Sequence, residues 1–198
     1  MLKNPNEFEK GKTIVYFIRH GERIHIPNSP DIGMIIPGPG LTKKGKSQAK
    51  KVAKELSKMK SEIDVLYCSE MTRAIETANE IGKKIGKKPI IVKGIAEFSD
   101  IIWKRKIHKA KFWGNYFKQI KSIKEFNKLL NKNKGKVIVM VVHGNVIKSL
   151  IFRKLGLSLK KSGFFHHMNC HISIARYNGK KLDHISCYNS NTIHHSSI

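Results

Sequence analysis

Four side chains with phosphate-binding chemistry stand beside the most regular parts of this sequence. Arg19 and His20 come directly after the apolar run TIVYFI, and His143 follows the apolar run VIVMVV. Arg73 lies in the first turn of an expected helix. A guanidinium pairs with phosphate oxygens through a fork of N–H donors, and a neutral imidazole nitrogen is able to accept a phosphoryl group. Each residue alone is consistent with a structural role, but together they are suited to a phosphate site rather than to a core.

The positions of these residues depend on a set of expected strands. Continuous apolar runs predict strands that are buried on both faces, and alternating apolar residues predict strands that are buried on one face. The expected strands are 13–18, 64–68, 89–92, 137–142, 172–177 and 182–188. The last two are expected to pair as a hairpin that turns at Asn178-Gly179.

Helical spacing of apolar residues predicts the segments between the strands. Helices are expected to begin at Thr42, after Ser69 as N-cap residue, and at about Val146, the last ending near Leu155. Residues 95–134 are expected to be irregular at first and then helical. The residues expected to face inward there are Phe117, Ile120, Ile123 and Phe126.

Alternation of strands and helices predicts an α/β fold. The expected architecture is a three-layer α/β/α sandwich with a mostly parallel central sheet, in a single domain over residues 1–198. Ligands of such sheets bind beyond the carboxyl ends of the strands, which is where Arg19, His20 and His143 lie. The proline-rich segment 19–40 is a long expected loop at the same edge, and loops of this length are usually functional or mobile.

Five ordered blocks of the sequence resemble motifs of the histidine phosphatase superfamily, also called the phosphoglycerate mutase-like superfamily. The blocks are Arg19-His20-Gly21-Glu22, LTKKGKSQA at 41–49, CSEMTRAIETA at 68–78, Glu97 within IAEF, and VHGNVI at 142–147. The matches span residues 13 to 147, and the tail with Asn169 and His194 is similar to the final strands of the family.

The resemblance implies a phosphate ester hydrolase that works through phosphohistidine on His20. Arg19, Arg73 and His143 would bind the non-bridging phosphate oxygens. Glu97 would protonate the leaving oxygen and then activate water.

Other implied features concern the backbone and metals. Gly21 would bind phosphate by letting the backbone approach it without a Cβ atom in the way. No cofactor or metal is implied, because arginines and histidines carry the positive charge. Five other histidines lack a recognised zinc spacing and are expected in a loop or a solvated tail, namely His166-His167, His171 and His194-His195.

The loop after His20 departs from the family pattern. Many members carry Asn six residues after the nucleophile, where this chain has Ile26, with Asn28 nearby. Arg23, His25, Asn28 and Asn145 are the candidate substrate-selecting residues.

Three functions remain open on the sequence. The first is hydrolysis of small phosphorylated molecules, and the second is phosphoglycerate mutase-type transfer. The mutases usually have a longer segment between the acid and the second histidine, which favours hydrolysis here. The third is a non-catalytic domain that binds anions or nucleic acid through its charge.

Composition limits the partners only broadly. The 198 residues include 39 Lys and Arg against 14 Asp and Glu, a formal charge of +25, which attracts anions of every kind. A solvated lysine-rich surface is the simpler interpretation, and the segment from Ile102 to Trp113 is the one candidate for a nucleic-acid surface. Three cysteines without a C-x-x-C pair, and the lack of a signal or membrane segment, predict a cytoplasmic protein with no membrane partner. The oligomeric state is left open, with a dimer as one alternative.

Overall fold

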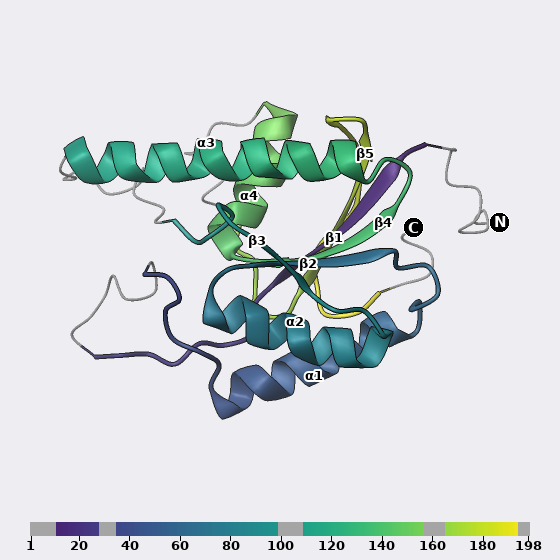
Figure 1. The fold of residues 1–198 in the computed structure, drawn as a ribbon, viewed down its shortest axis with the longest axis horizontal. Helices are drawn as coiled ribbons and strands as arrows, with labels where there is room; N and C mark the ends of the chain where they lie inside the picture. Colours follow the sequence, from purple (N-terminus) through teal and green to yellow (C-terminus); the bar gives the residue numbers. More distant parts are fainter. Residues whose placement is uncertain (1–10, 28–34, 99–108, 157–164, 194–198) are drawn as a thin grey trace.

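The computed structural model shows a sheet between two layers of helices (Figure 1). It describes residues 11–27, 35–98, 109–156 and 165–193. Within these residues the sheet has six strands in the order β3-β2-β4-β1-β5-β6. The strands are β1 (Thr13–Arg19), β2 (Val65–Ser69), β3 (Ile90–Val92), β4 (Val137–Val142), β5 (Ile172–Asn178) and β6 (Lys181–Ser190). The helices are α1 (Lys43–Ser57), α2 (Thr72–Ile85), α3 (Lys109–Lys132) and α4 (Gly144–Phe152), the last continued by the short 3-10 turn η4 (Arg153–Leu155).

The sheet is mostly parallel, as the sequence predicts. β1 pairs with β4, β4 with β2, and β2 with β3, all in parallel. β5 runs antiparallel to both of its neighbours, β1 and β6. Helices α1 and α2 cover one face and α3 and α4 cover the other, so the three-layer α/β/α prediction is confirmed (Figure 1).

Successive residues of the central strands supply the two hydrophobic cores. Ile14, Tyr16 and Ile18 of β1 pack into the core under α1 and α2, whereas Val15 and Phe17 pack into the core under α3 and α4. Successive side chains of a strand point to opposite faces. An uninterrupted apolar run is therefore what a strand with helices on both faces requires.

The predicted start of α1 is confirmed, whereas the predicted N-cap residue of α2 is not. Thr42 caps α1, since its hydroxyl accepts a hydrogen bond from the backbone N–H of Gly45 at 2.9 Å. The prediction that Ser69 caps the next helix is wrong. Ser69 ends β2, and the N-cap residue of α2 is Met71, which has no side-chain capping bond. The serine is therefore released for another contact.

The inward face of α3 is formed in part by other residues than the apolar periodicity indicates. Phe126 is fully buried and Ile123 packs against the core. Phe117 and Ile120 were expected to face inward, but they are 62% and 40% exposed. The buried side chains in this part of the helix are the polar Gln119 and Ser122, and the amide of Gln119 donates to Oγ of Ser149 in α4 at 2.8 Å. Phe117 and Ile120 therefore lie on a different face of α3.

The carboxy-terminal hairpin forms as expected, but its turn lies one residue later. Asn178 still belongs to β5 and pairs with Lys181, and Gly179 and Lys180 make the turn. Gly179 has a φ of 56°, which a residue without Cβ adopts without strain.

Two expectations about the whole chain concern membranes and disulfides. No helix in the described ranges is both long and apolar enough to cross a bilayer. Cys68, Cys170 and Cys187 are all free thiols.

Candidate active site

Three neighbouring parallel strands end at the same edge of the sheet and place the candidate residues there. β1 ends at Arg19, β2 at Ser69 and β4 at Val142, and β4 lies between the other two. His20 and His143 each follow one of these strands directly. Their ring centroids are 5.1 Å apart, although the residues are far apart in the chain.

A cavity of about 420 Å³ opens at this edge. Its lining residues are Arg19, His20, Glu22, Arg23, His25, Arg73, Glu97, Asn145 and Asn169. All of the predicted catalytic and substrate-selecting residues that are described line it, except His143, which lies beneath it against His20. Asn28, the remaining candidate, lies outside the described residues.

Two hydrogen bonds define the protonation of His20. Its Nδ1 lies 2.7 Å from the carbonyl oxygen of Gly21, which only accepts, so Nδ1 carries the proton. Its Nε2 accepts from Nε of Arg73 at 3.0 Å and therefore offers a lone pair. Burial, and then the charge of Arg73, hold the pKa of His20 well below its usual value. His20 is thus a neutral imidazole with an unprotonated nitrogen beside a guanidinium.

The two arginines of the cavity differ in burial: Arg19 is half-buried, whereas Arg73 is fully buried. Arg19 donates through Nη1 to the carbonyl oxygen of His167, and its Nε has no partner among the described residues. Arg73 is 1% exposed. Burial lowers the pKa of Arg73 to about 10, so the guanidinium stays charged at neutral pH. Two guanidinium groups at one cavity are strong donors to an anion.

Glu97 is the acidic group of the cavity and is 8% exposed. Burial raises its pKa to about 7, although the neighbouring Arg73 acts in the opposite direction. The backbone N–H of Phe98 donates to its Oε1 at 3.2 Å. The amide of Asn145 in turn donates to the carbonyl oxygen of Phe98 at 2.8 Å, which ties this segment to the start of α4.

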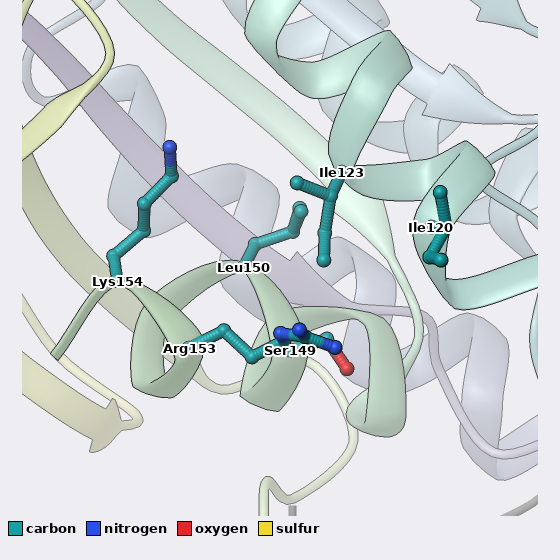
Figure 2. A pocket seen from close by; sticks show the side chains of 6 residues that line it. All are labelled: Ile120, Ile123, Ser149, Leu150, Arg153 and Lys154. Carbon is teal, nitrogen blue, oxygen red and sulfur yellow. The ribbon is translucent and has the colours of Figure 1, made fainter. Parts of the chain in front are cut away.

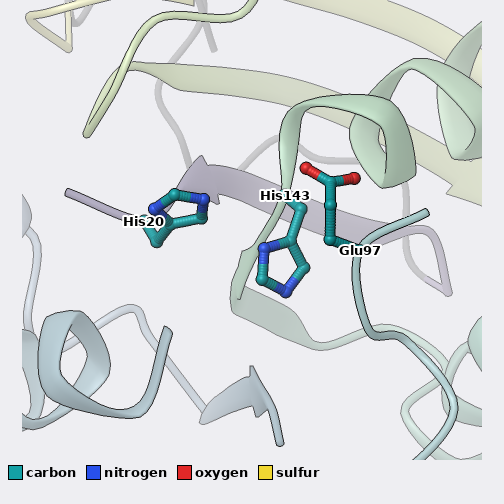
Figure 3. A group of neighbouring side chains, drawn as sticks. All are labelled: His20, Glu97 and His143. Atoms are coloured by element: carbon teal, nitrogen blue, oxygen red, sulfur yellow. The ribbon is translucent and has the colours of Figure 1, made fainter. Parts of the chain in front are cut away.

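His20, Glu97 and His143 form a compact cluster, with one potential ligand atom from each residue and all of these atoms within 4.8 Å of one another (Figure 3). Such a group has the spacing to bind a metal ion. However, Nε2 of His20 already accepts a hydrogen bond from Arg73, so its lone pair is engaged. Two guanidinium groups at this cluster favour an anion over a cation.

Gly21 has a packing role that the sequence did not predict. A Cβ atom at this position would lie 2.5 Å from the carbonyl oxygen of Gly45, in the first turn of α1. Its backbone N–H donates to the hydroxyl of Thr77 at 3.0 Å and is not directed to a ligand. The glycine therefore lets the end of β1 pack against α1, and its role in phosphate binding stays a prediction.

Three polar residues at the site were not among the predicted catalytic or binding residues. Ser69 contacts His143, with 2.8 Å between Oγ and Nε2. Asn169 lines the cavity and donates to the carbonyl oxygen of His20 at 2.8 Å. His167 was expected in a loop or a solvated tail, and it lies in a loop before β5. It is only 2% exposed, and burial lowers its pKa to about 4. Ser69 and Asn169 had a sequence signal, because Ser69 lies in the block CSEMTRAIETA and Asn169 in the tail that is similar to the family.

A second cavity, of about 290 Å³, lies between α3 and α4, away from these residues (Figure 2). It carries Arg153 and Lys154, which would be the cations of an alternative anion site. Both are already engaged: Arg153 donates to the amide oxygen of Gln119 at 3.2 Å, and Lys154 donates to the carbonyl oxygen of Lys180 at 2.8 Å. Of the segment proposed for nucleic acid, residues 102–108 lie outside the described ranges.

Comparison with solved structures identifies proteins of the same fold. A phosphoserine phosphatase mutant from Entamoeba histolytica, in complex with phosphoserine, has a TM-score of 0.69 and 24% identity over 90% of this chain and 98% of its own. A putative alpha-ribazole-5'-P phosphatase from Escherichia coli has a TM-score of 0.70 and 21% identity, over 92% of this chain and 98% of its own. A mycobacterial glucosyl-3-phosphoglycerate phosphatase has a TM-score of 0.70 and 17% identity, over 90% of this chain and 99% of its own. At these identities the likeness is one of fold.

Comparison of the sequence shows the family. No curated protein matches the chain. The family model described as histidine phosphatase superfamily (branch 1) matches residues 15–190, which include the five motif blocks and the hairpin. The resemblance seen in the motifs is confirmed: the chain belongs to the histidine phosphatase superfamily.

Proposed function

We propose that this protein hydrolyses phosphate monoesters of small molecules through a phosphohistidine on His20. The observation that carries the proposal is the neutral His20, whose unprotonated Nε2 lies against Arg73 in a cationic cavity. Family membership supports the same reaction class. A buried imidazole whose pKa is held low is ready to act as a nucleophile at neutral pH.

In the first step, the phosphate group enters the cavity and replaces His20 as the acceptor of the hydrogen bond from Arg73. Arg73, Arg19 and His143 donate to its non-bridging oxygens, where charge develops. Nε2 of His20 then forms a bond to phosphorus, and the bond to the ester oxygen breaks. The electron pair leaves with that oxygen, which takes the proton of Glu97.

In the second step, water hydrolyses the phosphohistidine. Glu97, now a carboxylate, takes a proton from the water molecule while the water oxygen attacks phosphorus. The bond between nitrogen and phosphorus breaks, and its electron pair returns to His20. A pKa of about 7 at Glu97 suits both of its roles, because acid and base forms are then both populated at neutral pH. The positive charge comes from protein side chains, so we propose that no metal is needed.

Replacing Glu97 with glutamine tests this function through the leaving group. We expect kcat/KM for an alkyl phosphate to fall by about 10²- to 10⁴-fold. The loss for 4-nitrophenyl phosphate should be much smaller, because nitrophenolate leaves without a proton. In the wild type, kcat/KM for the alkyl ester should fall as pH rises through about 7, where the acid is deprotonated, and the variant should lack this limb. The measurement is inorganic phosphate release across a pH series.

The matched control is Glu55→Gln, which removes a carboxylate that pairs with Lys58 on the outer surface of α1. It should retain the wild-type pH profile. Equal losses for both esters in the Glu97 variant would contradict its role as the acid. Conversion of 3-phosphoglycerate to 2-phosphoglycerate without phosphate release would identify the mutase instead.

Arg23 brings a third guanidinium to the cavity, and we propose that it selects the substrate. A phosphate monoester carries nearly two negative charges at neutral pH, which Arg19 and Arg73 match. Of the two carboxylates that line the cavity, Glu22 is paired with Lys44 at 3.0 Å, and the other is protonated when it acts as the acid.

One positive charge is therefore left without a counterpart in the bound phosphate. Arg23 is held at the cavity by a hydrogen bond from its Nη1 to the carbonyl oxygen of Ile24, at 3.2 Å. His25 and Asn145 lie beside it in the lining. We infer a substrate with a second acidic group, either a carboxylate or another phosphate.

A three-carbon substrate series tests this role of Arg23. The wild type should prefer 3-phosphooxypropanoate and propane-1,3-diol bisphosphate over propyl phosphate by about tenfold in kcat/KM, the effect of one charge-assisted hydrogen bond. The preference should disappear in Arg23→Gln and persist in Lys50→Gln, which removes a charge from the exposed side of α1. A preference that survives in Arg23→Gln would exclude this residue as the selector.

A further inference from the structure

Ser69 and His143 are joined by a buried hydrogen bond beneath the proposed nucleophile. Both residues are fully buried. Ser69 ends β2 and His143 follows β4, and the two strands pair directly in parallel. The distance between Oγ of Ser69 and Nε2 of His143 is 2.8 Å. A contact this short holds the imidazole in one orientation.

The hydrogen atoms of this pair have one consistent arrangement. The backbone N–H of Met71 points to Oγ of Ser69 at 3.4 Å, so this oxygen already accepts a bond. Its own proton needs an acceptor, and among the described residues the available one is Nε2 of His143. Burial, and then His20, hold the pKa of His143 well below its usual value, so the ring is neutral and has a single N–H. That N–H must then be on Nδ1.

Nδ1 of His143 is the nitrogen that faces the site. It is buried and has no partner among the described residues. Figure 3 shows it on the side of the ring that faces His20, whereas Nε2 points away. A donor in this position is directed to a phosphoryl oxygen at His20.

We propose that Ser69 is a positioning residue that holds His143 in the tautomer with the proton on Nδ1, and so makes it a hydrogen-bond donor to the phosphoryl group. The inference rests on the proposed function for its consequence in catalysis. The tautomer itself is a property of the protein without substrate. In the other tautomer, Nδ1 would present a lone pair to an anion, and the interaction would be repulsive.

Nitrogen NMR of protein labelled with ¹⁵N-histidine tests the proposal directly, because protonated and unprotonated ring nitrogens resonate far apart. The signals of His143 are assigned by their loss in His143→Asn. We expect the proton on Nδ1 in the wild type, a shift of population to Nε2 in Ser69→Ala, and a return to Nδ1 in Ser69→Thr, which keeps the hydroxyl. Phosphate release by Ser69→Ala should fall by about tenfold.

The chain offers a matched control in a second buried pair. Ser173 Oγ lies 2.8 Å from Nε2 of His167, and Ser173→Ala should leave the signals of His143 unchanged. A wild-type proton on Nε2 of His143 would overturn the proposal without reference to any variant. An Nδ1 proton that persists in Ser69→Ala would overturn it as well. A wild type that carries the proton on Nδ1 of His143 but releases no phosphate from any ester would instead reject the proposed function and leave the tautomer assignment intact.

Discussion

Replacement of His20 with alanine is expected to reduce phosphate release to below roughly one part in 10⁴ of the wild-type rate, because the variant has no atom to accept the phosphoryl group. The residual rate would come from the cationic pocket alone. A rapid acid-free quench with ³²P-labelled substrate should trap a labelled protein in the wild type only. The label should be lost in acid and kept in base, as expected for a phosphorus–nitrogen bond. This result would assign both the nucleophile and the chemical class of the intermediate.

The control for His20 is His184→Ala, which removes an exposed histidine from β6 and should leave turnover and labelling intact. A chelator should also leave the wild-type rate unchanged, because the proposed site draws its charge from side chains. Substantial turnover by His20→Ala would exclude the phosphohistidine mechanism. Phosphate binding without release, in the wild type and the variant alike, would support a non-catalytic anion-binding domain.

Replacement of Arg73 with glutamine is expected to lower kcat by about 10³- to 10⁵-fold, the range for a guanidinium that stabilises a phosphoryl-transfer transition state. Arg73 donates to the proposed nucleophile at 3.0 Å, and it is buried with no solvent to take its place. Arg73→Lys should recover only a small part of the loss, since an ammonium keeps the charge but not the fork of donors. The measurement is single-turnover phosphate release at saturating substrate.

Removal of a buried arginine can also change the fold, so the variants are compared by circular dichroism and thermal unfolding. Arg153→Gln removes a guanidinium from the cavity between α3 and α4 and should keep a rate close to that of the wild type. An Arg73→Gln protein that is folded and turns over substrate within tenfold of the wild type would contradict the proposed clamp.

Local patterns in the sequence determined most of the architecture. The apolar runs that became β1 and β4 predicted strands covered on both faces, and each contributes alternately to two cores. The strand and helix order then predicted the layers and the edge of the sheet at which the site lies. These signals are readable because they depend on residues close together in the chain.

The same local reading was wrong where a contact with a distant segment decides the outcome. The spacing of Phe117 and Ile120 fits an inward helix face, but both are exposed. The inward face there carries Gln119, which is buried and donates to Ser149 of α4. Ser69 has the chemistry of an N-cap residue, but its hydroxyl lies against His143. The packing role of Gly21 was likewise not visible locally, because the carbonyl oxygen that a Cβ would meet belongs to Gly45 in α1.

The sequence by itself therefore determined the family, the fold and the identity of most residues that meet at the carboxyl ends of the strands. Only the tertiary structure decided their chemical states. The proton position on His20, the low pKa values of both histidines and the pKa of about 7 at Glu97 arise from burial and from partners such as Arg73. Desolvation and hydrogen bonding depend on which atoms surround a group in space, and residues far apart in the chain supply those atoms.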